Sequence, residues 1–169
     1  MRVVLLGAGG FLGGRLAGRL AAEGQVAGRE ISELVLSDIR PIGMPMTGAC
    51  AITQVPGDLR DPALLNALFA KPVDMICHLA ATLTIDAEGD VRRGLETNVL
   101  GLVDLLERCR QQAKAPMLLF ASSIDTFGGQ LPAVVGDDVV QVPSTSYGTH
   151  KVVAELLLAD YSRHGFVDG

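Results

Sequence analysis

The sequence predicts an α/β domain whose doubly wound parallel sheet carries helices on both faces. Residues 2–22 read as a short apolar strand, a glycine turn and a helix with apolar residues at helical spacing. Four more apolar runs follow, separated by polar or helical stretches long enough to cross a sheet. This alternation favours a three-layer Rossmann-type arrangement, with five parallel strands in the order 3-2-1-4-5 in one domain spanning residues 1–169.

Composition and charge narrow the class of protein. The chain has 169 residues, of which 49% are hydrophobic, enough to bury a core of its own. Its net charge of −5 and the lack of a basic cluster argue against a nucleic-acid partner. No apolar run approaches a membrane span, and residues 1–6 do not form a signal peptide. The three cysteines stand singly among apolar residues, as expected for reduced thiols in a cytoplasmic protein.

The glycine turn follows the strand at residues 3–6. It contains three glycines spaced three apart: Gly7, Gly10 and Gly13. A Cβ atom there would block both a bound pyrophosphate and close packing of the helix on the strand. The unpaired N–H groups at the helix start, around Phe11 and Leu12, form an anion site together with the helix dipole. The turn therefore indicates a dinucleotide phosphate site, the alternative being a plain tight turn.

The first helix is predicted to end near Gly24, before a surface loop around residues 28–30 and a second strand at 31–37. This strand delivers Asp38 at its carboxyl end, the position that accepts the two hydroxyls of the adenine ribose in a dinucleotide fold. A carboxylate there repels a 2′-phosphate, so Asp38 favours NAD over NADP. Arg40 is a counter-signal, because a guanidinium is what the 2′-phosphate of NADP needs.

Residues 41–49 read as a Pro/Gly loop, followed by a third strand at 50–55. Asp58 lies just beyond that strand, where its carboxylate is suited to accept a hydrogen bond from the adenine amino group. An aspartate at this place fits an ordinary turn equally well. Asp61 then caps a short helix at 63–69.

The fourth strand, residues 73–81, contains His78 and ends in small residues. A lone histidine in an apolar strand is most often a packed core group, and no second ligand stands at metal-binding spacing, so no metal site is predicted. The small side chains at the strand end let a cofactor lie against the backbone of Leu79, Ala80 and Ala81. The loop at 82–90 begins with Thr82 and is predicted to line the substrate side.

A long helix is predicted over residues 91–114, with Asn98 on its apolar stripe. A buried asparagine must find hydrogen-bond partners, so Asn98 is either a structural tie or an organiser of the active site. The fifth strand, residues 117–121, ends in Ser122 and Ser123, and an irregular segment follows at the same edge of the sheet.

The last helix, residues 147–164, carries the side chains best suited to acid–base chemistry. Tyr147 and Lys151 lie one turn apart and share a face. A phenol alone is a poor base at neutral pH, but a neighbouring ammonium and a nicotinamide cation lower its pKa. Ser123 can then hold the substrate oxygen while Tyr147 takes its proton and hydride leaves to NAD. Because this spacing also occurs on many solvated helix faces, the interpretation depends on the strand-end serines and the glycine turn.

Taken in order, these motifs resemble the extended short-chain dehydrogenase/reductases, the NAD-dependent epimerase/dehydratase group. The likeness runs over the whole chain: GAGGFLG, Asp38, GDL ending at Leu59, HLAA, Asn98, Ser123 and Tyr147-x-x-x-Lys151. It implies NAD as the cofactor, held at the glycine turn and the strand ends. It also implies that Ser123, Tyr147 and Lys151 are catalytic and that Asn98 organises the site.

A narrower resemblance is to the D-erythronate dehydrogenase branch of that family. It is carried by SSIDTFGGQLPAVVGDD and by the stretch at 145–169, and it implies oxidation of a four-carbon sugar acid at C2. Asp125 departs from the pattern, which usually has a small or apolar residue just after the catalytic serine. Members of the family continue well beyond the active-site helix. We therefore expect an N-terminal part of a longer enzyme, truncated before the substrate lobe. If 169 residues were the whole molecule, the sheet would end at 117–121 with an uncovered edge.

Three functions are open at this point. The first is an NAD-dependent dehydrogenase of a small sugar acid, and the second is a nucleotide-sugar epimerase or dehydratase with the same triad. Net redox change in NAD separates these two. The third is a non-catalytic NAD-binding module, against which the intact Ser123, Tyr147 and Lys151 argue. The resemblance also implies a homodimer, formed through the helices that carry Asn98 and Tyr147.

Overall fold

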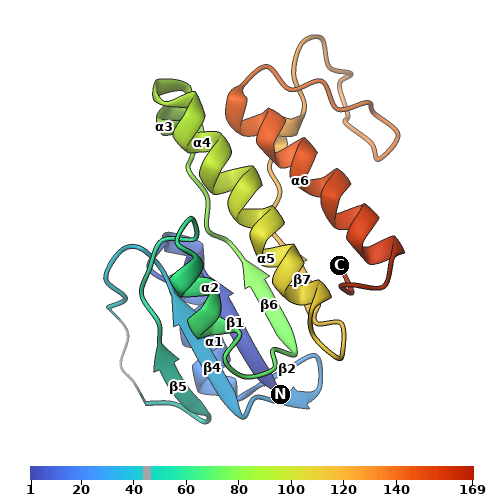
Figure 1. Ribbon diagram of the computed structural model, residues 1–169. Helices are drawn as coiled ribbons and strands as arrows, with labels where there is room; N and C mark the ends of the chain where they lie inside the picture. The colour runs from blue at the N-terminus through green and yellow to red at the C-terminus, as the bar shows by residue number, and fades with distance from the viewer. Residues whose placement is uncertain (44–46) are drawn as a thin grey trace.

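The computed structural model describes residues 1–43 and 47–169, so the loop predicted at 41–49 lies partly outside the described residues. Its centre is a five-stranded parallel sheet in the order β5-β4-β1-β6-β7 (Figure 1). The strands are β1 (Arg2–Leu6), β4 (Glu33–Ser37), β5 (Ala51–Gln54), β6 (Met75–His78) and β7 (Met117–Phe120). Counted along the chain within this sheet, the order is 3-2-1-4-5, and the predicted topology is confirmed.

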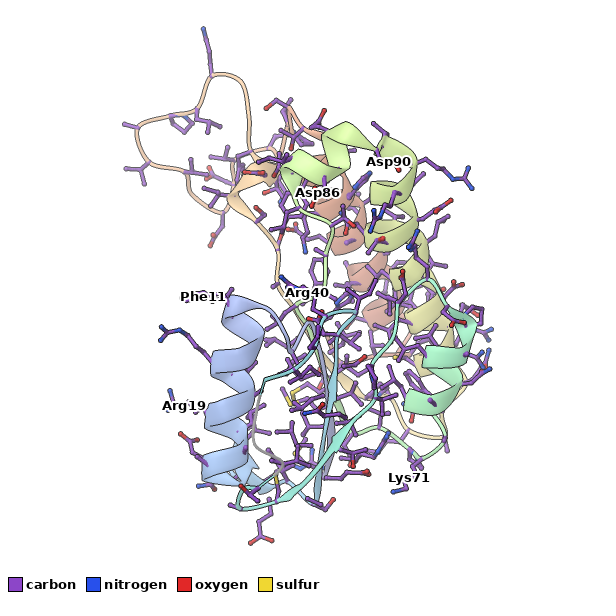
Figure 2. All side chains as sticks on the ribbon, turned by 90° about the vertical axis from the view of Figure 1, so that its left-hand side faces the viewer. Phe11, Arg19, Arg40, Lys71, Asp86 and Asp90 are labelled. Carbon is purple, nitrogen blue, oxygen red and sulfur yellow. The ribbon has the colours of Figure 1, made fainter. Side chains whose placement is uncertain are left out.

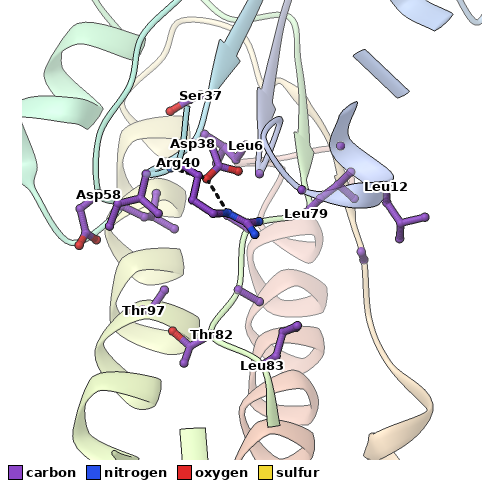
Figure 3. Close-up of a pocket in the computed structure, with 18 of the residues that line it drawn as sticks. Leu6, Leu12, Ser37, Asp38, Arg40, Asp58, Leu79, Thr82, Leu83 and Thr97 are labelled. Atoms are coloured by element: carbon purple, nitrogen blue, oxygen red, sulfur yellow. Dashed lines mark hydrogen bonds and ion pairs between the residues drawn. The ribbon is translucent and has the colours of Figure 1, made fainter. Parts of the chain in front are cut away.

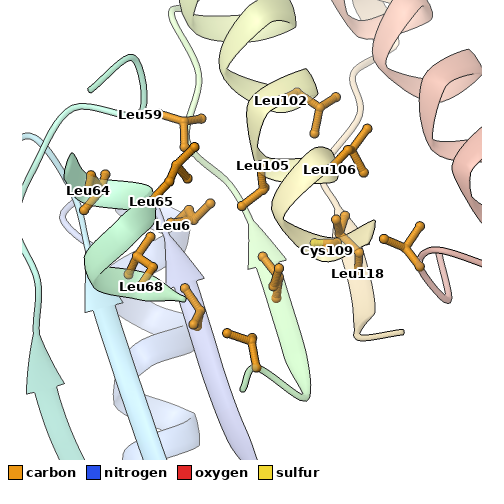
Figure 4. Packing of buried hydrophobic residues seen from close by; sticks show 14 of the residues in the cluster. Leu6, Leu59, Leu64, Leu65, Leu68, Leu102, Leu105, Leu106, Cys109 and Leu118 are labelled. Carbon is orange, nitrogen blue, oxygen red and sulfur yellow. The ribbon is translucent and has the colours of Figure 1, made fainter. Parts of the chain in front are cut away.

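Alternate residues of the strands enter two separate apolar cores. On β1, Val3 and Leu5 pack with α1 (Phe11–Glu23), whereas Val4 and Leu6 belong to the core on the other face. That second face is covered by α2 (Pro62–Leu68), α5 (Gly101–Arg110) and α6 (Ser146–Arg163). Figure 4 shows the leucines of α2 and α5 above the strands. The side-chain period of two along each strand thus produces the predicted three layers.

Local sequence fixes the helix ends near the predicted positions. α1 ends at Glu23, because Gly24 adopts a left-handed φ of 62° and donates its N–H to the carbonyl of Leu20. α2 starts after Asp61, whose carboxylate accepts the N–H of Ala63. α6 starts after Thr145, whose hydroxyl accepts the N–H of Gly148 at 2.9 Å. Within residues 1–43 and 47–169, no helix combines the length and apolarity that a membrane crossing needs.

The surface loop predicted around residues 28–30 is a small antiparallel hairpin. It consists of β2 (Gln25–Val26) and β3 (Arg29–Glu30). The turn between them places Ala27 and Gly28 at φ 50° and 71°. Two-residue strands are too short to show a period in the sequence, which is why the hairpin was not predicted.

Two segments near the site also differ from expectation. The loop predicted at 82–90 contains a short helix, α3 (Thr84–Gly89). The single helix predicted over 91–114 ends at Arg110 and is interrupted: α4 (Val91–Leu95) and α5 flank a turn of π-helix, η1 (Glu96–Leu100). A π-helical turn admits one extra residue and is often found at functional sites. Asn98 lies in this turn.

The edge strand β7 is partly covered. The N–H of Leu118 donates to the carbonyl of Asp168 at 2.8 Å, and the N–H of Asp168 donates to the carbonyl of Pro116 at 2.9 Å. The expectation of an uncovered edge is therefore wrong for the beginning of this strand. Further along β7, Leu119 remains 51% exposed.

Candidate functional site

A cavity of about 690 Å³ opens where the carboxyl ends of the parallel strands meet the start of α1 (Figure 3). Most of the residues predicted to bind cofactor or substrate line it: Gly7, Gly10, Phe11, Leu12, Gly13, Asp38, Asp58, Leu59, Leu79, Ala80, Ala81, Thr82, Tyr147 and Lys151. Asn98 and Ser123 are not among the lining residues, but each is bonded to one: Asn98 to Thr82 and Ser123 to Tyr147. Five strand ends and two helix starts, distant in sequence, thus converge on one space.

The glycine turn packs so closely that side chains are excluded from it. Gly7 has a φ of 88°, and a Cβ atom there would lie 2.7 Å from the backbone nitrogen of Ala80. A Cβ on Gly13 would overlap the carbonyl oxygen of Gly7. Gly10 is the N-cap of α1 and offers no side chain to its first turn. The N–H groups at the start of α1 are therefore free of a side-chain cap where the helix borders the cavity, as an anion site requires.

Asp38 is almost fully buried because two backbone N–H groups bind its carboxylate. Gly9 donates to Oδ2 at 2.9 Å and Arg40 donates to Oδ1 at 2.8 Å. The guanidinium of Arg40 lies 3.6 Å from Oδ1 and remains mostly exposed. Figure 2 shows Arg40 beside Phe11 at the start of α1, and Figure 3 shows its ion pair with Asp38 at the cavity wall. Asp38 therefore ties the glycine turn to the end of β4 as well as facing the site.

Asp58 sits at the end of the cavity beyond β5. Its carboxylate is bound by Arg60, with Nη2 and Oδ2 2.6 Å apart, and hydrogen bonding to Arg60 lowers the pKa of Asp58. Arg60 in turn lies 3.7 Å from Glu96 on η1. The carboxylate is thus ionised and partly occupied by Arg60, and an adenine amino group would share it.

Asn98 joins three elements behind the cavity. Its Oδ1 accepts the N–H of Thr82 at 2.8 Å, and its Nδ2 donates to the carbonyl of Thr82 at 2.8 Å. The same Nδ2 lies 3.3 Å from Nδ1 of His150 on α6. The amide of Asn98 therefore fixes the backbone after β6 against α6.

Lys151 and Tyr147 project from the first turns of α6 into the cavity. The Lys151 ammonium is 3% exposed, donates to the carbonyl of Ala121 at 2.7 Å, and lies 5.5 Å from the centre of the Tyr147 ring. Burial lowers the pKa of Lys151 to about 8. Burial raises the pKa of Tyr147, and a hydrogen bond with Ser123 acts in the opposite direction.

The direction for Tyr147 differs from the sequence-based expectation. Among the protein's own groups, burial outweighs the effects that favour the phenolate, and the charge of Asp125 adds to the rise. The depressed pKa expected for the catalytic base would therefore depend on the positive charge of a nicotinamide ring.

Ser123 stands between Tyr147 and the segment after β7. Its hydroxyl oxygen accepts the N–H of Asp125 at 3.1 Å, as the cap of η2 (Ile124–Thr126). This contact uses the hydroxyl oxygen as acceptor and leaves the hydroxyl hydrogen of Ser123 for the hydrogen bond with Tyr147. Its neighbour Ser122 lines the cavity and bonds to Glu155 on α6. The two serines at the end of β7 therefore make different contacts: Ser122 binds α6, and Ser123 caps η2. The sequence did not predict this division.

Helix α3 is joined to α6 and to η2 by side chains that sequence reasoning missed or misread. Asp125, noted only as a departure from the family pattern, accepts the hydroxyl of Thr84 at 2.8 Å. Glu88 accepts the N–H of Ser146, the residue before Tyr147, at 2.5 Å. His150 holds Asn98. The only indication in the sequence that His150 belongs to the site is its position next to Lys151. Glu88 could not be identified from the sequence, because its partner Ser146 lies 58 residues away.

His78 behaves as a packed core group. Its ring is 2% exposed, meets Phe120 edge-on with ring centres 5.6 Å apart, and leaves Nδ1 without a hydrogen-bond partner among the described residues. Across residues 1–43 and 47–169, the structure contains no group of three histidine, cysteine or acidic side chains placed to hold a metal ion.

Comparison with known proteins places this geometry in a family. Residues 3–168 match the model of the NAD dependent epimerase/dehydratase family. The D-erythronate dehydrogenase of Cupriavidus necator is 42% identical over 100% of this chain and 53% of its own length. The chain therefore spans about half the length of the curated relatives it matches.

Solved structures agree. The nucleoside-diphosphate-sugar epimerase from Agrobacterium tumefaciens superposes with a TM-score of 0.93 at 36% identity, over 100% of this chain and 51% of that one. MoeE5, solved with UDP-glucuronic acid and NAD, superposes with a TM-score of 0.82 at 30% identity, over 99% of this chain and 52% of that one. By fold, motif and sequence, the chain belongs to the NAD-dependent epimerase/dehydratase family, the extended short-chain dehydrogenase/reductases.

Proposed function

We propose that this chain is the cofactor-binding and catalytic part of an NAD-dependent dehydrogenase that oxidises a secondary hydroxyl of a small sugar acid, at C2 of a D-erythronate-like substrate. The observation that carries the proposal is one cavity walled by the glycine turn, Asp38, Tyr147 and Lys151. The sugar-acid assignment rests on the 42% identity to a D-erythronate dehydrogenase.

The cavity fits NAD at several independent points. The uncapped start of α1 suits a pyrophosphate, and a Cβ on Gly10 would intrude there, 3.2 Å from the carbonyl oxygen of Gly7. Asp38 supplies a carboxylate for ribose hydroxyls, and Asp58 one for the adenine amino group. Exposed apolar side chains at the rim, Phe11 and Ile39 among them, give flat rings a surface to cover.

The chain's own residues divide the work of oxidation. When bound, NAD accepts the hydride that leaves the carbon of the alcohol. Ser123 donates a hydrogen bond to the substrate oxygen, and the Tyr147 phenolate takes the hydroxyl proton, so that a carbonyl group remains. The Lys151 ammonium stabilises the phenolate from one helical turn away. Asn98 acts as a positioning residue, because it fixes Thr82 and α6 relative to each other.

A nucleotide-sugar epimerase or dehydratase is the alternative, favoured by the close superposition on the Agrobacterium tumefaciens epimerase. The same three side chains serve it, but NAD is regenerated within each turnover. A non-catalytic NAD-binding module is the third reading, and it would not need Tyr147 or Lys151.

The test uses the full-length gene product with NAD and a panel of four- to six-carbon sugar acids, followed by absorbance of the reduced nicotinamide. We expect signal with D-erythronate and a loss of about 10²-fold or more in Tyr147→Phe, because that variant removes the general base. Tyr161→Phe is the matched control, since its hydroxyl bonds to Glu107, away from the cavity. If no sugar acid of the panel reduces NAD while NAD still binds, the epimerase is favoured. Full activity in Tyr147→Phe would contradict the catalytic role of Ser123, Tyr147 and Lys151.

A further inference from the structure

Glu155 makes two contacts that the proposed chemistry leaves unexplained. It lies on α6, one turn after Lys151 and two turns after Tyr147. One carboxylate oxygen accepts the hydroxyl of Ser122, the cavity-lining serine beside Ser123. The other accepts the side-chain amide of Gln141 at 2.8 Å. One side chain therefore joins the end of β7 and a distant loop to the catalytic helix.

Gln141 belongs to the segment at 127–145, which forms no helix or strand. A second cavity of about 450 Å³ lies beneath this segment, with Glu155, Gln141 and Asp137 in its wall. Glu155 thus stands at the partition between the two cavities: Ser122 faces the first and Gln141 the second.

The surroundings of Lys151 leave its charge poorly compensated. Its ammonium contacts the carbonyl of Ala121 and lies 4.3 Å from the centre of the Phe120 ring on β7. On β6, burial and the charge of Lys151 lower the pKa of His78 to about 3, so that ring is neutral. Tyr147 on the same helix is also neutral, since burial raises its pKa. Among the described residues, Glu155 is the carboxylate whose charge raises the pKa of Lys151 against the effect of burial.

We propose that Glu155 is a positioning residue with two linked roles: it holds Ser122-Ser123 and the Gln141 segment against α6, and its negative charge keeps Lys151 in the ammonium form. Its importance for turnover rests on the proposed function, because only there must Lys151 be charged to stabilise the Tyr147 phenolate. The contacts themselves do not depend on which substrate is used.

The experiment follows the titration of Lys151 by carbon NMR of the lysine Cε atoms. The sequence contains three lysines, Lys71, Lys114 and Lys151, so Lys151→Arg assigns the signal. In the wild type we expect a midpoint of about 8. Glu155→Gln should move it to lower pH, because the counter-charge is gone while hydrogen-bonding atoms remain. Glu155→Asp retains the charge and should move it less.

Asp160→Asn is the matched control, because it removes the same charge from α6 at an exposed site paired with Arg163. It should leave the Lys151 midpoint unchanged. Ser122→Ala tests the other role: with the Glu155 charge intact, the midpoint should stay near the wild-type value while amide hydrogen exchange at 123–141 becomes faster. A Lys151 midpoint equal in wild type and Glu155→Gln, or unchanged exchange in Ser122→Ala, would overturn the proposal.

The titration needs neither NAD nor a substrate. One outcome is that Glu155→Gln lowers the titration midpoint of Lys151 as expected while no sugar acid reduces NAD in the presence of the enzyme. In that case the role of Glu155 stands and only the proposed dehydrogenase activity is contradicted. In an active enzyme, Glu155→Gln should also move the alkaline limit of kcat/KM to lower pH by the same interval, which a purely structural effect would not do.

Discussion

Asp38 is a charged side chain buried at the wall of the cavity, and its two backbone hydrogen bonds explain how it is tolerated there. The same carboxylate lines the cavity, and Arg40 stands next to it. Under the proposed function, selectivity between NAD and NADP would be a balance between the buried negative charge of Asp38 and the exposed positive charge of Arg40.

Asp38→Asn keeps the shape and removes the charge. We expect the ratio of NADP to NAD dissociation constants to fall by about tenfold, which corresponds to roughly 1.4 kcal/mol of lost repulsion. Calorimetric titration with both dinucleotides measures it. Arg40→Gln is the companion variant, and it should weaken the binding of NADP more than the binding of NAD. An unchanged ratio in Asp38→Asn would show that the carboxylate does not face the ribose.

His78 makes stability depend on pH. Burial holds its pKa at about 3 in the folded protein, against about 6.5 in the unfolded chain. Below pH 6.5 the imidazole of His78 binds a proton in the unfolded state but stays neutral in the folded state. The stability present at neutral pH is therefore lost as the pH falls toward 3. Between pH 7.5 and 5 this one residue accounts for a loss of about 2 kcal/mol. Burial lowers the pKa of His150 as well, which adds a loss of the same sign.

Urea unfolding at pH 7.5 and pH 5 tests this. His78→Asn should reduce the difference between the two free energies of unfolding, even if the variant is less stable at both. His164→Asn is the control, because His164 is largely exposed at the end of α6. The lowered pKa values of Glu33 and Asp58 act only at more acidic pH, and Lys151 contributes little, so within this window the loss comes mainly from the histidines. An equal loss in the wild type and His78→Asn would contradict the assignment.

At the scale of elements, α1 contains one glycine that cannot be replaced by a larger residue, Gly13, and one that can, Gly18. A Cβ on Gly13 would overlap the carbonyl of Gly7, whereas one on Gly18 meets nothing within 4 Å. Gly13→Ala should therefore destabilise the protein by about 3 kcal/mol and abolish NAD binding, because the turn must open. Gly18→Ala should stabilise it by about 0.5–1 kcal/mol, since alanine is the better helix former. Denaturant unfolding and NAD titration check both, and equal behaviour would mean that the turn does not pack as described.

The elements that the sequence predicted well are those whose signal is local. The end of α1 at Gly24, the Asp61 cap of α2 and the Thr145 cap of α6 all lie within a few residues of the groups they bind. The strands were found because each is a short run rich in apolar residues, and β1, β4 and β6 are buried almost throughout. Helix α3 was missed, since six residues are too few to display a helical period and its fastening comes from elsewhere in the chain.

The site follows the same rule. Most of the predicted residues that line the cavity fall at strand ends and at the glycine turn, where chain order alone places them, and Tyr147 and Lys151 follow from their spacing on α6. The partners that hold them could not be predicted: Glu88 reaches Ser146 across 58 residues, and Asn98 reaches His150 across 52. The residue pattern left two roles open for Asn98, the family resemblance implied that it organises the site, and in the structure it binds Thr82 and His150. These contacts depend on the π-helical turn, which no spacing rule indicates.

At the scale of the whole molecule, we propose that two copies associate through the paired helices η1–α5 and α6, which lie side by side in Figure 1. Both leave apolar side chains in solvent: Leu156 on α6 is 67% exposed and Leu100 on η1 is 45% exposed. Burying such side chains against a second copy would remove apolar area from water. The proposed dimer would also hold α6, with Tyr147 and Lys151, from the side away from the cavity.

Leu156→Lys should break this dimer, because it places a charge where the two copies would meet. The mass from light scattering should fall from that of two chains to that of one, with the free energy of unfolding at low concentration nearly unchanged. Val134→Lys is the matched control: its side chain is equally apolar and exposed, but it lies in the irregular segment away from the helix pair. If the wild type is monomeric across a wide concentration range, or if Val134→Lys dissociates it as readily as Leu156→Lys, the helices η1–α5 and α6 are not the interface, and their exposed leucines need another partner.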